Sequence, residues 1–215
     1  FRLVSLIKHD NMQEEYAKIQ PNLVIPALVH DGKLIIESMD IIDYLDDNWP
    51  QNPLRPSDAE SLALCRALVE QAKALHISVR YMTFKWSLGG LGKTDAATAE
   101  RVAKLQSEGS PEQLAEFYAK FNSDSIDAAT FAEHLRALET GYGEQDKRLS
   151  ENGGPYLLGE RFTIADIIWS IKVLRLIECG YPFAQHFPNL YQWYQRVAAR
   201  PGFKNGVSSK NWFFH

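Results

Sequence analysis

The chain has 215 residues, of which 45% are apolar, enough for one large or two small domains with buried cores. Its 27 acidic and 23 basic residues are spread along the sequence and leave a net charge of −4, which excludes the strongly basic footprint of proteins that bind nucleic acid or a membrane surface. No apolar run approaches the roughly 20 residues that cross a bilayer.

The two cysteines, Cys65 and Cys179, lie far apart and fall in predicted helices. This spacing predicts neither CxxC redox chemistry nor a metal site. No secretory leader is recognisable and there is no initiator Met, so we expect a cytoplasmic protein whose chain continues upstream of Phe1.

The N-terminal stretch predicts a strand, a helix, a hairpin and a second helix. Residues 1–7 are rich in β-formers, and residues 11–19 place Met12, Tyr16 and Ile19 at helical spacing. Apolar runs at 27–30 and 34–36 flank Asp31-Gly32, a pair that favours a tight hairpin turn. A helix is then expected from Ser38 to about Asp47, and its first turn offers free N–H groups to an anion.

Two features of this stretch have alternative interpretations. Pro26 precedes a strand, where it can be an ordinary trans proline or a cis proline that turns the backbone of Ile25 toward a ligand. Glu37-Ser38 can serve as a helix N-cap with a neighbouring acid, or as ligand-binding groups, and the two roles are compatible.

The combination of Ile25-Pro26-Ala27-Leu28, Asp31-Gly32 and Glu37-Ser38 with Ile41 resembles the glutathione-binding half of the glutathione transferase superfamily. The resemblance implies that Pro26 is cis and that the backbone of Ile25 pairs with the cysteinyl unit of glutathione. It further implies that Glu37 and Ser38 hold the γ-glutamyl end, with glutathione as co-substrate.

The resemblance also implies a thioredoxin-like domain whose first strand and helix are missing from the sequence. The family's thiol-activating Ser, Tyr or Cys belongs to that part, so the catalytic residue is expected upstream of Phe1. Leu23 stands where the family has Gly or His, and Val24 where it often has Lys or Gln. Lys8 and His9 are therefore candidates for the glycyl carboxylate, or else part of a solvated loop.

Prolines among polar residues at 46–58 predict a linker, which divides the chain into residues 1–48, a linker at 49–58 and a helical domain at 59–215. An apolar stripe from Ala59 to about Trp86 predicts one helix of about seven turns. In this family that helix faces the electrophilic substrate. Its aromatic end can line a substrate pocket or belong to the core, with these candidates: Tyr81, Phe84, Lys85 and Trp86.

Residues 87–125 read as an inserted module with polar helices at 93–107 and 111–122. In length and placement it is similar to the insertion of bacterial members that include the β-etherases. The module could cover the substrate cleft or build a dimer contact. A long helix follows at 125–149, with these apolar positions facing inward: Ile126, Ala129, Phe131, Leu135, Leu138 and Tyr142.

Thr163 and Asp166 form a capping box at the start of a mostly apolar helix that runs to about Cys179, and Gly180 is placed to end it. In the family the same segment opens the central helix of the second domain, so Asp166 has a structural role. The apolar tail at 211–215 is expected to pack on something.

The predicted fold is therefore an α/β thioredoxin-like N-terminal domain followed by an all-α C-terminal helical bundle. The resemblance implies an enzyme that uses glutathione thiolate to attack a hydrophobic electrophilic small molecule, by conjugation or by β-aryl ether cleavage. It also implies a homodimer. The alternative is a non-catalytic binding or interaction module with the same fold.

Overall fold

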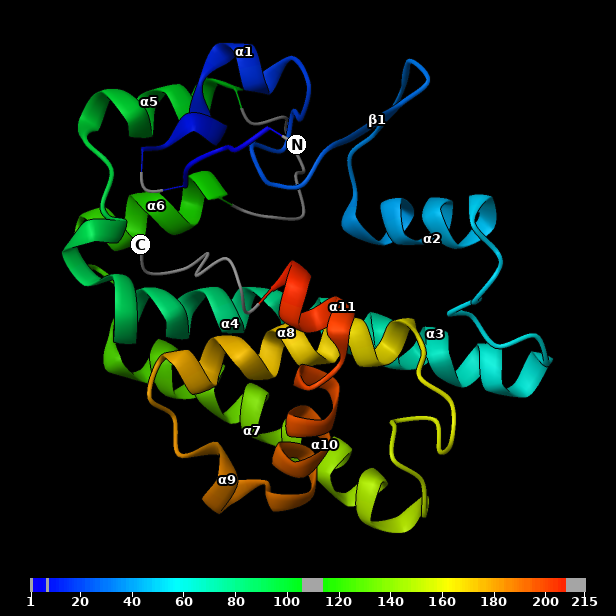
Figure 1. Cartoon of the computed structure of the whole chain (residues 1–215). Helices are drawn as coiled ribbons and strands as arrows, with labels where there is room; N and C mark the ends of the chain where they lie inside the picture. Colours follow the sequence, from blue (N-terminus) through cyan, green and yellow to red (C-terminus); the bar gives the residue numbers. More distant parts are fainter. Residues whose placement is uncertain (1, 7, 106–113, 208–215) are drawn as a thin grey trace. The chain divides into compact units, whose positions relative to one another are not determined.

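The computed structural model describes residues 2–6, 8–105 and 114–207 (Figure 1). The chain forms two compact units: the first comprises Phe1–Pro53 and Leu88–Thr130, and the second Leu54–Ser87 and Phe131–His215. Residues 88–130, most of which belong to the predicted inserted module, thus share a unit with the N-terminal stretch. The division at 49–58 that the prolines suggest stays a prediction.

The first unit contains a small antiparallel sheet and short helices. In chain order these are the 3-10 helix η1 (Asp10–Met12), α1 (Glu14–Ala17), β1 (Leu28–His30), β2 (Lys33–Ile35), α2 (Ser38–Asn48), the 3-10 helix η3 (Gly89–Gly92), α5 (Ala96–Leu105) and α6 (Leu114–Asn122). The predicted hairpin is confirmed, because Asp31 and Gly32 have φ of 48° and 78° and β1 pairs with β2. Positive φ at both central residues matches the twist of the flanking strands.

The strand predicted at residues 1–7 is wrong for the part that the structure describes. Residues 2–6 are irregular, and their hydrogen bonds go to the following turn. The Ser5 N–H donates to Asp10 Oδ2 at 2.9 Å, and the Asp10 N–H donates to the Ser5 carbonyl at 2.9 Å. A strand needs a ladder partner, and β-forming residues alone do not supply one.

Helices α5 and α6 form the described part of the predicted inserted module. The Thr94 N–H donates to Asn122 Oδ1 at 3.0 Å, and Asn122 Nδ2 donates to Thr94 Oγ1 at 2.7 Å, so the start of one helix is joined to the end of the other. Phe117 and Phe121 are buried and stack with ring centroids 5.6 Å apart. These two rings bury one apolar face of α6.

Apart from an isolated β-bridge between Tyr156 and Gly159, the regular elements of the second unit, over its described residues, are helices. Its elements are α3 (Ala59–Ala74), α4 (His76–Thr83), the π-helix η2 (Phe84–Leu88), α7 (Ala128–Glu151), which enters this unit at Phe131, α8 (Ile164–Glu178), α9 (Phe183–His186), α10 (Pro188–Ala198) and α11 (Pro201–Gly206). Helix α8 packs against α3, α4 and α10 (Figure 1). Trp169 is fully buried, and its Nε1 donates to the Leu68 carbonyl at 3.0 Å.

The single helix predicted at 59–86 is interrupted twice. Leu75 lies between α3 and α4 with ψ of −4°, and η2 then replaces the last α-helical turn. A Cβ added at Gly141 would lie 2.5 Å from Leu75 Cδ1, so α7 leaves room for the Leu75 side chain. An apolar stripe does not reveal such changes in the backbone hydrogen-bond ladder.

The helix predicted at 125–149 is confirmed as α7, but its apolar face is narrower than expected. Leu138 and Tyr142 are fully buried, whereas Ala129 is exposed. The remaining three predicted core positions are partly exposed: Ile126, Phe131 and Leu135. The tail at 211–215 lies outside the described residues.

Helix α8 begins and ends as predicted. Thr163 and Asp166 close the capping box, and Gly180 follows the helix with φ of 81°. The Tyr181 N–H donates back to the Leu176 carbonyl at 3.0 Å, which satisfies a carbonyl of the last turn. In the described part of the chain, no helix combines the length and apolar content needed to cross a membrane.

Candidate functional site

The loop at residues 20–26 of the first unit turns at Pro21 and Asn22 and then exposes Ile25 and Pro26. The Ile25–Pro26 bond is cis, and the Ile25 side chain is 44% exposed. Asn11 Nδ2 donates to the Leu23 carbonyl at 2.6 Å, and the Tyr16 hydroxyl donates to the Val24 carbonyl at 2.8 Å. Two side chains from η1 and α1 therefore fix the backbone just before the Ile25–Pro26 bond.

Leu23 occupies a conformation that favours glycine. Its φ is 59°, in the left-handed region, and its side chain is completely buried. A Cβ in this region costs roughly 1–2 kcal/mol, while burying a leucine side chain stabilises the fold by about 1.5–3 kcal/mol. Leucine thus replaces the family's glycine at position 23, and the burial of the Leu23 side chain offsets the strain of the Leu23 backbone.

Glu37 and Ser38 lie at the start of α2, and both are exposed. Glu37 occupies the N-cap position with extended backbone, and its side chain makes no capping hydrogen bond. Its Oε1 instead accepts a hydrogen bond from Asn22 Nδ2 at 3.2 Å. The capping interpretation is therefore wrong for the Glu37 side chain, and the carboxylate faces solvent beside the free N–H groups of the first helical turn.

This arrangement suits a ligand that carries an ammonium and a carboxylate close together. The Glu37 carboxylate can accept from an ammonium, while the first-turn N–H groups of α2 and the Ser38 hydroxyl can donate to a carboxylate. The exposed loop backbone at Ile25 can pair with an extended peptide. All of these groups belong to the first unit.

Lys8 and His9 differ in environment. Lys8 is exposed. His9 is partly buried with φ of 55°, and its Nδ1 is a buried atom with no hydrogen-bond partner among the described residues. The solvated-loop interpretation therefore fits Lys8 better than His9.

The four predicted pocket residues in the second unit do not share one environment. Tyr81 is buried and stacks on His134 with ring centroids 3.9 Å apart. Lys85 Nζ lies 4.0 Å from the centre of the Phe131 ring. These contacts leave Tyr81 mainly in the core.

Trp86 belongs to a different group of rings. It is 36% exposed and stacks on Tyr181 at 6.0 Å, whereas Phe84 is partly buried. Trp86 is thus the largest exposed aromatic surface among the four predicted pocket residues.

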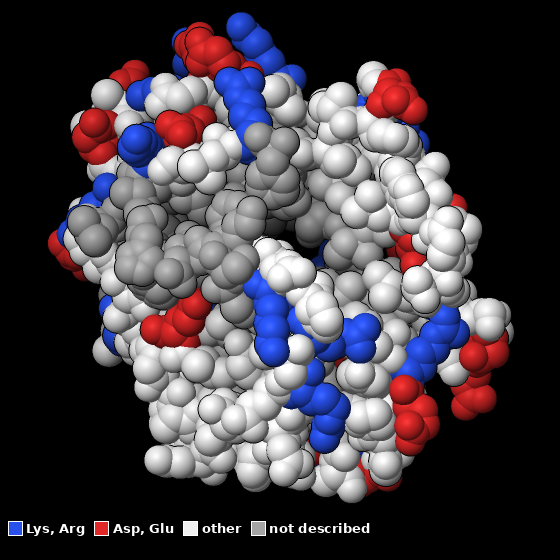
Figure 2. Space-filling model, viewed as in Figure 1, with Lys and Arg blue, Asp and Glu red and all other residues white. Residues whose placement is uncertain are grey.

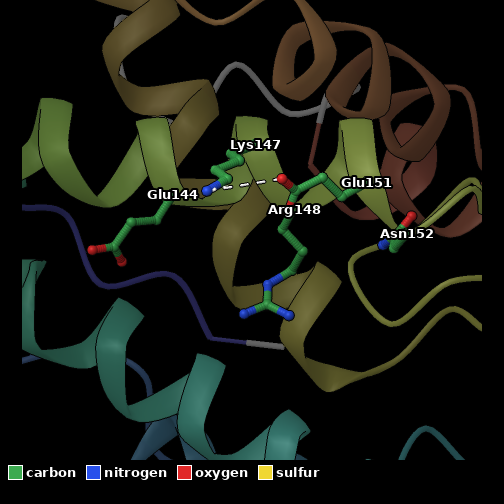
Figure 3. Close-up of a pocket in the computed structure, with 5 residues that line it drawn as sticks. All are labelled: Glu144, Lys147, Arg148, Glu151 and Asn152. Atoms are coloured by element: carbon green, nitrogen blue, oxygen red, sulfur yellow. Dashed lines mark ion pairs between the residues drawn. The ribbon is translucent and has the colours of Figure 1, made fainter.

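A surface hollow of about 420 Å³ lies at the end of α7 (Figure 3). Its lining is polar and charged, and comprises Glu144, Lys147, Arg148, Glu151 and Asn152. Lys147 Nζ pairs with Glu151 Oε1 at 3.8 Å on adjacent turns of one helix. The hollow contains none of the predicted site residues and has the chemistry of a solvated helix face.

Charges of both signs are distributed over the face shown in Figure 2. Groups of Lys and Arg side chains and groups of Asp and Glu side chains both appear there, and neither sign covers the face. This distribution offers no single-signed field that would steer a large polyanion.

Three residues of the site carry no motif in the sequence. Asn22, Gln20 and Tyr16 all make hydrogen bonds that hold the loop or Glu37. The sequence marked Tyr16 only as a position at helical spacing, and it carried no signal for the hydrogen bonds of Gln20 and Asn22. Their partners lie 8 to 16 residues away, so the pairings depend on the fold.

Comparison with known proteins agrees with this geometry. Residues 1–53 match the model of the glutathione S-transferase N-terminal domain, and residues 112–201 match that of the C-terminal domain. The glutathione S-transferase Z2 of Arabidopsis thaliana is 26% identical over 208 residues, which span 96% of this chain and 78% of the relative. LigF of Sphingobium sp. strain SYK-6 is 24% identical over 92% of this chain and 78% of its own length.

The crystal structure of the β-etherase LigF superposes with a TM-score of 0.82 at 24% identity, over 97% of this chain and 87% of LigF. Maleyl pyruvate isomerase, a bacterial zeta-class protein, superposes with a TM-score of 0.69 at 18% identity, over 96% of this chain and 83% of its own. The predicted fold class, a small α/β domain followed by a helical domain, is confirmed. Both domain models and the shared fold show that the chain belongs to the glutathione transferase superfamily.

Proposed function

We propose that this protein is a glutathione-dependent enzyme that directs the glutathione thiolate at an apolar or aromatic electrophile. The observation that carries the proposal is the placement of exposed Glu37 and Ser38 at the start of α2, in the same compact unit as the exposed backbone of Ile25 and Pro26. Relatives named as glutathione S-transferases and structures solved with bound glutathione support glutathione as the co-substrate.

In the proposed complex each part of glutathione has a partner. The Ile25 backbone pairs with the cysteinyl unit beside Pro26, Glu37 accepts from the γ-glutamyl ammonium, and Ser38 donates to the neighbouring carboxylate. Such contacts hold the sulfur beside the electrophile, so the enzyme gains rate by positioning rather than by a covalent bond to its own side chains.

In the chemical step the glutathionyl group is transferred to the electrophile. The thiol proton goes to solvent, the thiolate forms a sulfur–carbon bond, and the leaving group departs with the bonding electron pair. In conjugation with an aryl halide the leaving group is the halide ion, and in β-aryl ether cleavage it is a phenolate. The β-etherase LigF among the relatives favours testing an aryl ether.

The electrophile is proposed to contact the aromatic end of α4 and η2. Trp86 and Lys85 are exposed and Phe84 is partly buried, so these three are better placed to touch a substrate than the buried Tyr81. Replacing Trp86 by Ala should raise the KM for an aromatic electrophile and leave the KM for glutathione unchanged.

Binding is tested by calorimetry with glutathione. The double variant Glu37→Ala, Ser38→Ala should lose glutathione binding. The matched control is Ser150→Ala, Glu151→Ala, which removes an adjacent exposed Ser and Glu from α7 and should bind as the wild type does. Unchanged affinity in the first double variant would contradict the site.

Catalysis is tested separately by incubating the protein with glutathione and either an activated aryl halide or a β-aryl ether. Mass spectrometry should detect the glutathione adduct. Glutathione binding without any adduct would favour the alternative function, a binding module with this fold.

We also propose a homodimer in the cytoplasm. The outer face of the hairpin carries Val29 and Leu34, cross-strand partners that are 64% and 44% exposed. Burying such a face against a second copy removes apolar surface from water. Light scattering should give the dimer mass for the wild type and the monomer mass for a Val29→Asp, Leu34→Lys variant.

The free thiols of Cys65 and Cys179 fit a reducing compartment.

A further inference from the structure

The side chain of Gln20 connects the two segments that carry the proposed ligand contacts. It is fully buried, and its Nε2 donates to the Ile36 carbonyl at 3.0 Å. Its Oε1 accepts the backbone N–H of Asn22 at 3.1 Å. One buried amide thus joins the loop at 20–26 to the residue that precedes Glu37, and both of its polar ends are satisfied.

Asn22 extends this connection to the carboxylate itself. Its Nδ2 donates to Glu37 Oε1 at 3.2 Å, while its backbone is held by Gln20. An exposed glutamate side chain loses rotamer freedom when it binds a ligand, and a donor that restrains it beforehand reduces that cost. Because Asn22 uses Oε1, Oε2 is left to accept a hydrogen bond from a ligand.

We propose that Asn22 is a positioning residue that orients the Glu37 carboxylate for the ammonium group of the γ-glutamyl end, with Gln20 holding Asn22 in place. The inference rests on the proposed function and deepens it. It predicts that Asn22 contributes to the preference for a peptide with a free α-amino group over the same peptide without one.

Other contacts in the loop supply a control. Tyr16 also holds the loop, through the Val24 carbonyl, but does not touch Glu37. Removing its hydroxyl should loosen the backbone before Ile25 and weaken every peptide ligand alike. Asn48 supplies a second control, because it is exposed and donates within its own helix to the Tyr44 carbonyl.

The experiment measures affinity for glutathione and for the des-amino analogue, in which hydrogen replaces the γ-glutamyl ammonium. Calorimetry at pH 7 compares the wild type with Asn22→Ala, Tyr16→Phe and Asn48→Ala. Asn22→Ala should lower the affinity for glutathione about tenfold and the affinity for the analogue less than about twofold. Only glutathione has the ammonium group that binds the oriented Glu37 carboxylate. Tyr16→Phe should weaken the binding of glutathione and of the analogue equally. Asn48→Ala should change the affinity for neither peptide.

A double-mutant cycle then tests whether Asn22 acts through Glu37. In a Glu37→Gln background, Asn22→Ala should cause no further loss of glutathione affinity. Additive losses would assign Asn22 to general loop structure and overturn the proposal. Asn22 is only partly buried, and circular dichroism of each variant checks that it folds.

The possible failures are distinguishable. If the wild type binds glutathione and Asn22→Ala keeps the full preference over the analogue, this inference is wrong while the proposed function stands. If the wild type binds neither peptide, the proposed function and this inference are both overturned.

Discussion

Trp193 donates its indole N–H to Asp166 Oδ1 at 2.8 Å, although the two residues are 27 positions apart and both are buried. The same carboxylate accepts the Leu157 N–H at 3.0 Å and the Thr163 N–H at 2.8 Å. Burial raises the pKa of Asp166, while these donors lower it. Asp166 therefore joins three segments of the second unit, beyond its role in capping α8.

Replacing Asp166 by Ala should destabilise the protein by about 3 kcal/mol or more, because several buried donors lose their acceptor. Urea denaturation measures the loss. The matched control is Asp127→Ala, which removes an exposed carboxylate at the N-terminus of α7 that accepts the Thr130 N–H at 2.7 Å, and should cost about 1 kcal/mol. Equal losses at the two positions would contradict the bridging role of Asp166.

The partly buried side chain of His76 should make the protein less stable in acid. Burial, followed by the charges of Lys172, Arg80 and Arg175, lowers the pKa of His76 from 6.5 to about 3. On acidification, His76 of the unfolded chain therefore binds a proton near pH 6.5, whereas His76 of the folded chain binds it only near pH 3. The contribution of His76 to stability is present above pH 6.5 and falls as pH decreases, by up to about 1.4 kcal/mol per pH unit.

A His76→Gln variant tests this prediction. Between pH 6 and pH 4 its free energy of unfolding should fall less steeply than that of the wild type. The matched control is His186→Gln, which makes the same substitution at an exposed position on α9. The prediction fails if the pH dependence of the His76 variant coincides with that of the wild type.

At position 23, a glycine variant should be more stable than an alanine variant, the reverse of the usual order of stability. Both Leu23→Ala and Leu23→Gly remove a fully buried side chain, at a cost of about 2–5 kcal/mol. Glycine adopts φ of 59° without strain, whereas alanine keeps the Cβ penalty, so Leu23→Gly should be more stable than Leu23→Ala by about 1 kcal/mol. Thermal unfolding of the two variants decides the order, and a more stable alanine variant would exclude strain at this position.

Two glycines should respond differently to the same added methyl group. At Gly154 a Cβ would lie 2.3 to 2.5 Å from the backbone of Gly159, and a backbone cannot rotate away. At Gly141 the nearest atom is the end of the flexible Leu75 side chain. Gly154→Ala should therefore cost about 1–3 kcal/mol.

Gly141→Ala should stay within about 1 kcal/mol of the wild type, because alanine favours the helix by about that amount. Chemical denaturation of both variants compares them. Similar losses would mean that Leu75 cannot move.

Local signals in the sequence predicted the features that depend on neighbouring residues. Asp31-Gly32 predicted the hairpin, and Thr163 with Asp166 predicted the start of α8, because each motif brings its own backbone requirement. The cis bond at Pro26 was one of two local alternatives, and the family resemblance selected it.

The features that sequence could not predict depend on contacts between distant residues. The bond from Asn22 to Glu37 spans 15 positions and exists only once the hairpin has returned the chain. The close approach of the Leu75 side chain to Gly141 joins residues 66 positions apart in two helices. The irregular path of residues 2–6 depends on a turn that binds their backbone, which β-propensity does not anticipate.

The assignment of residues 88–130 to the first unit has a consequence for synthesis and cleavage. The chain passes from one unit to the other at residues 53/54, 87/88 and 130/131. A protease that cuts the stretch at 49–58 therefore leaves the two units joined by covalent bonds elsewhere. On the ribosome, the first unit cannot be completed until residue 130 has emerged, by which time α3 and α4 have already been made.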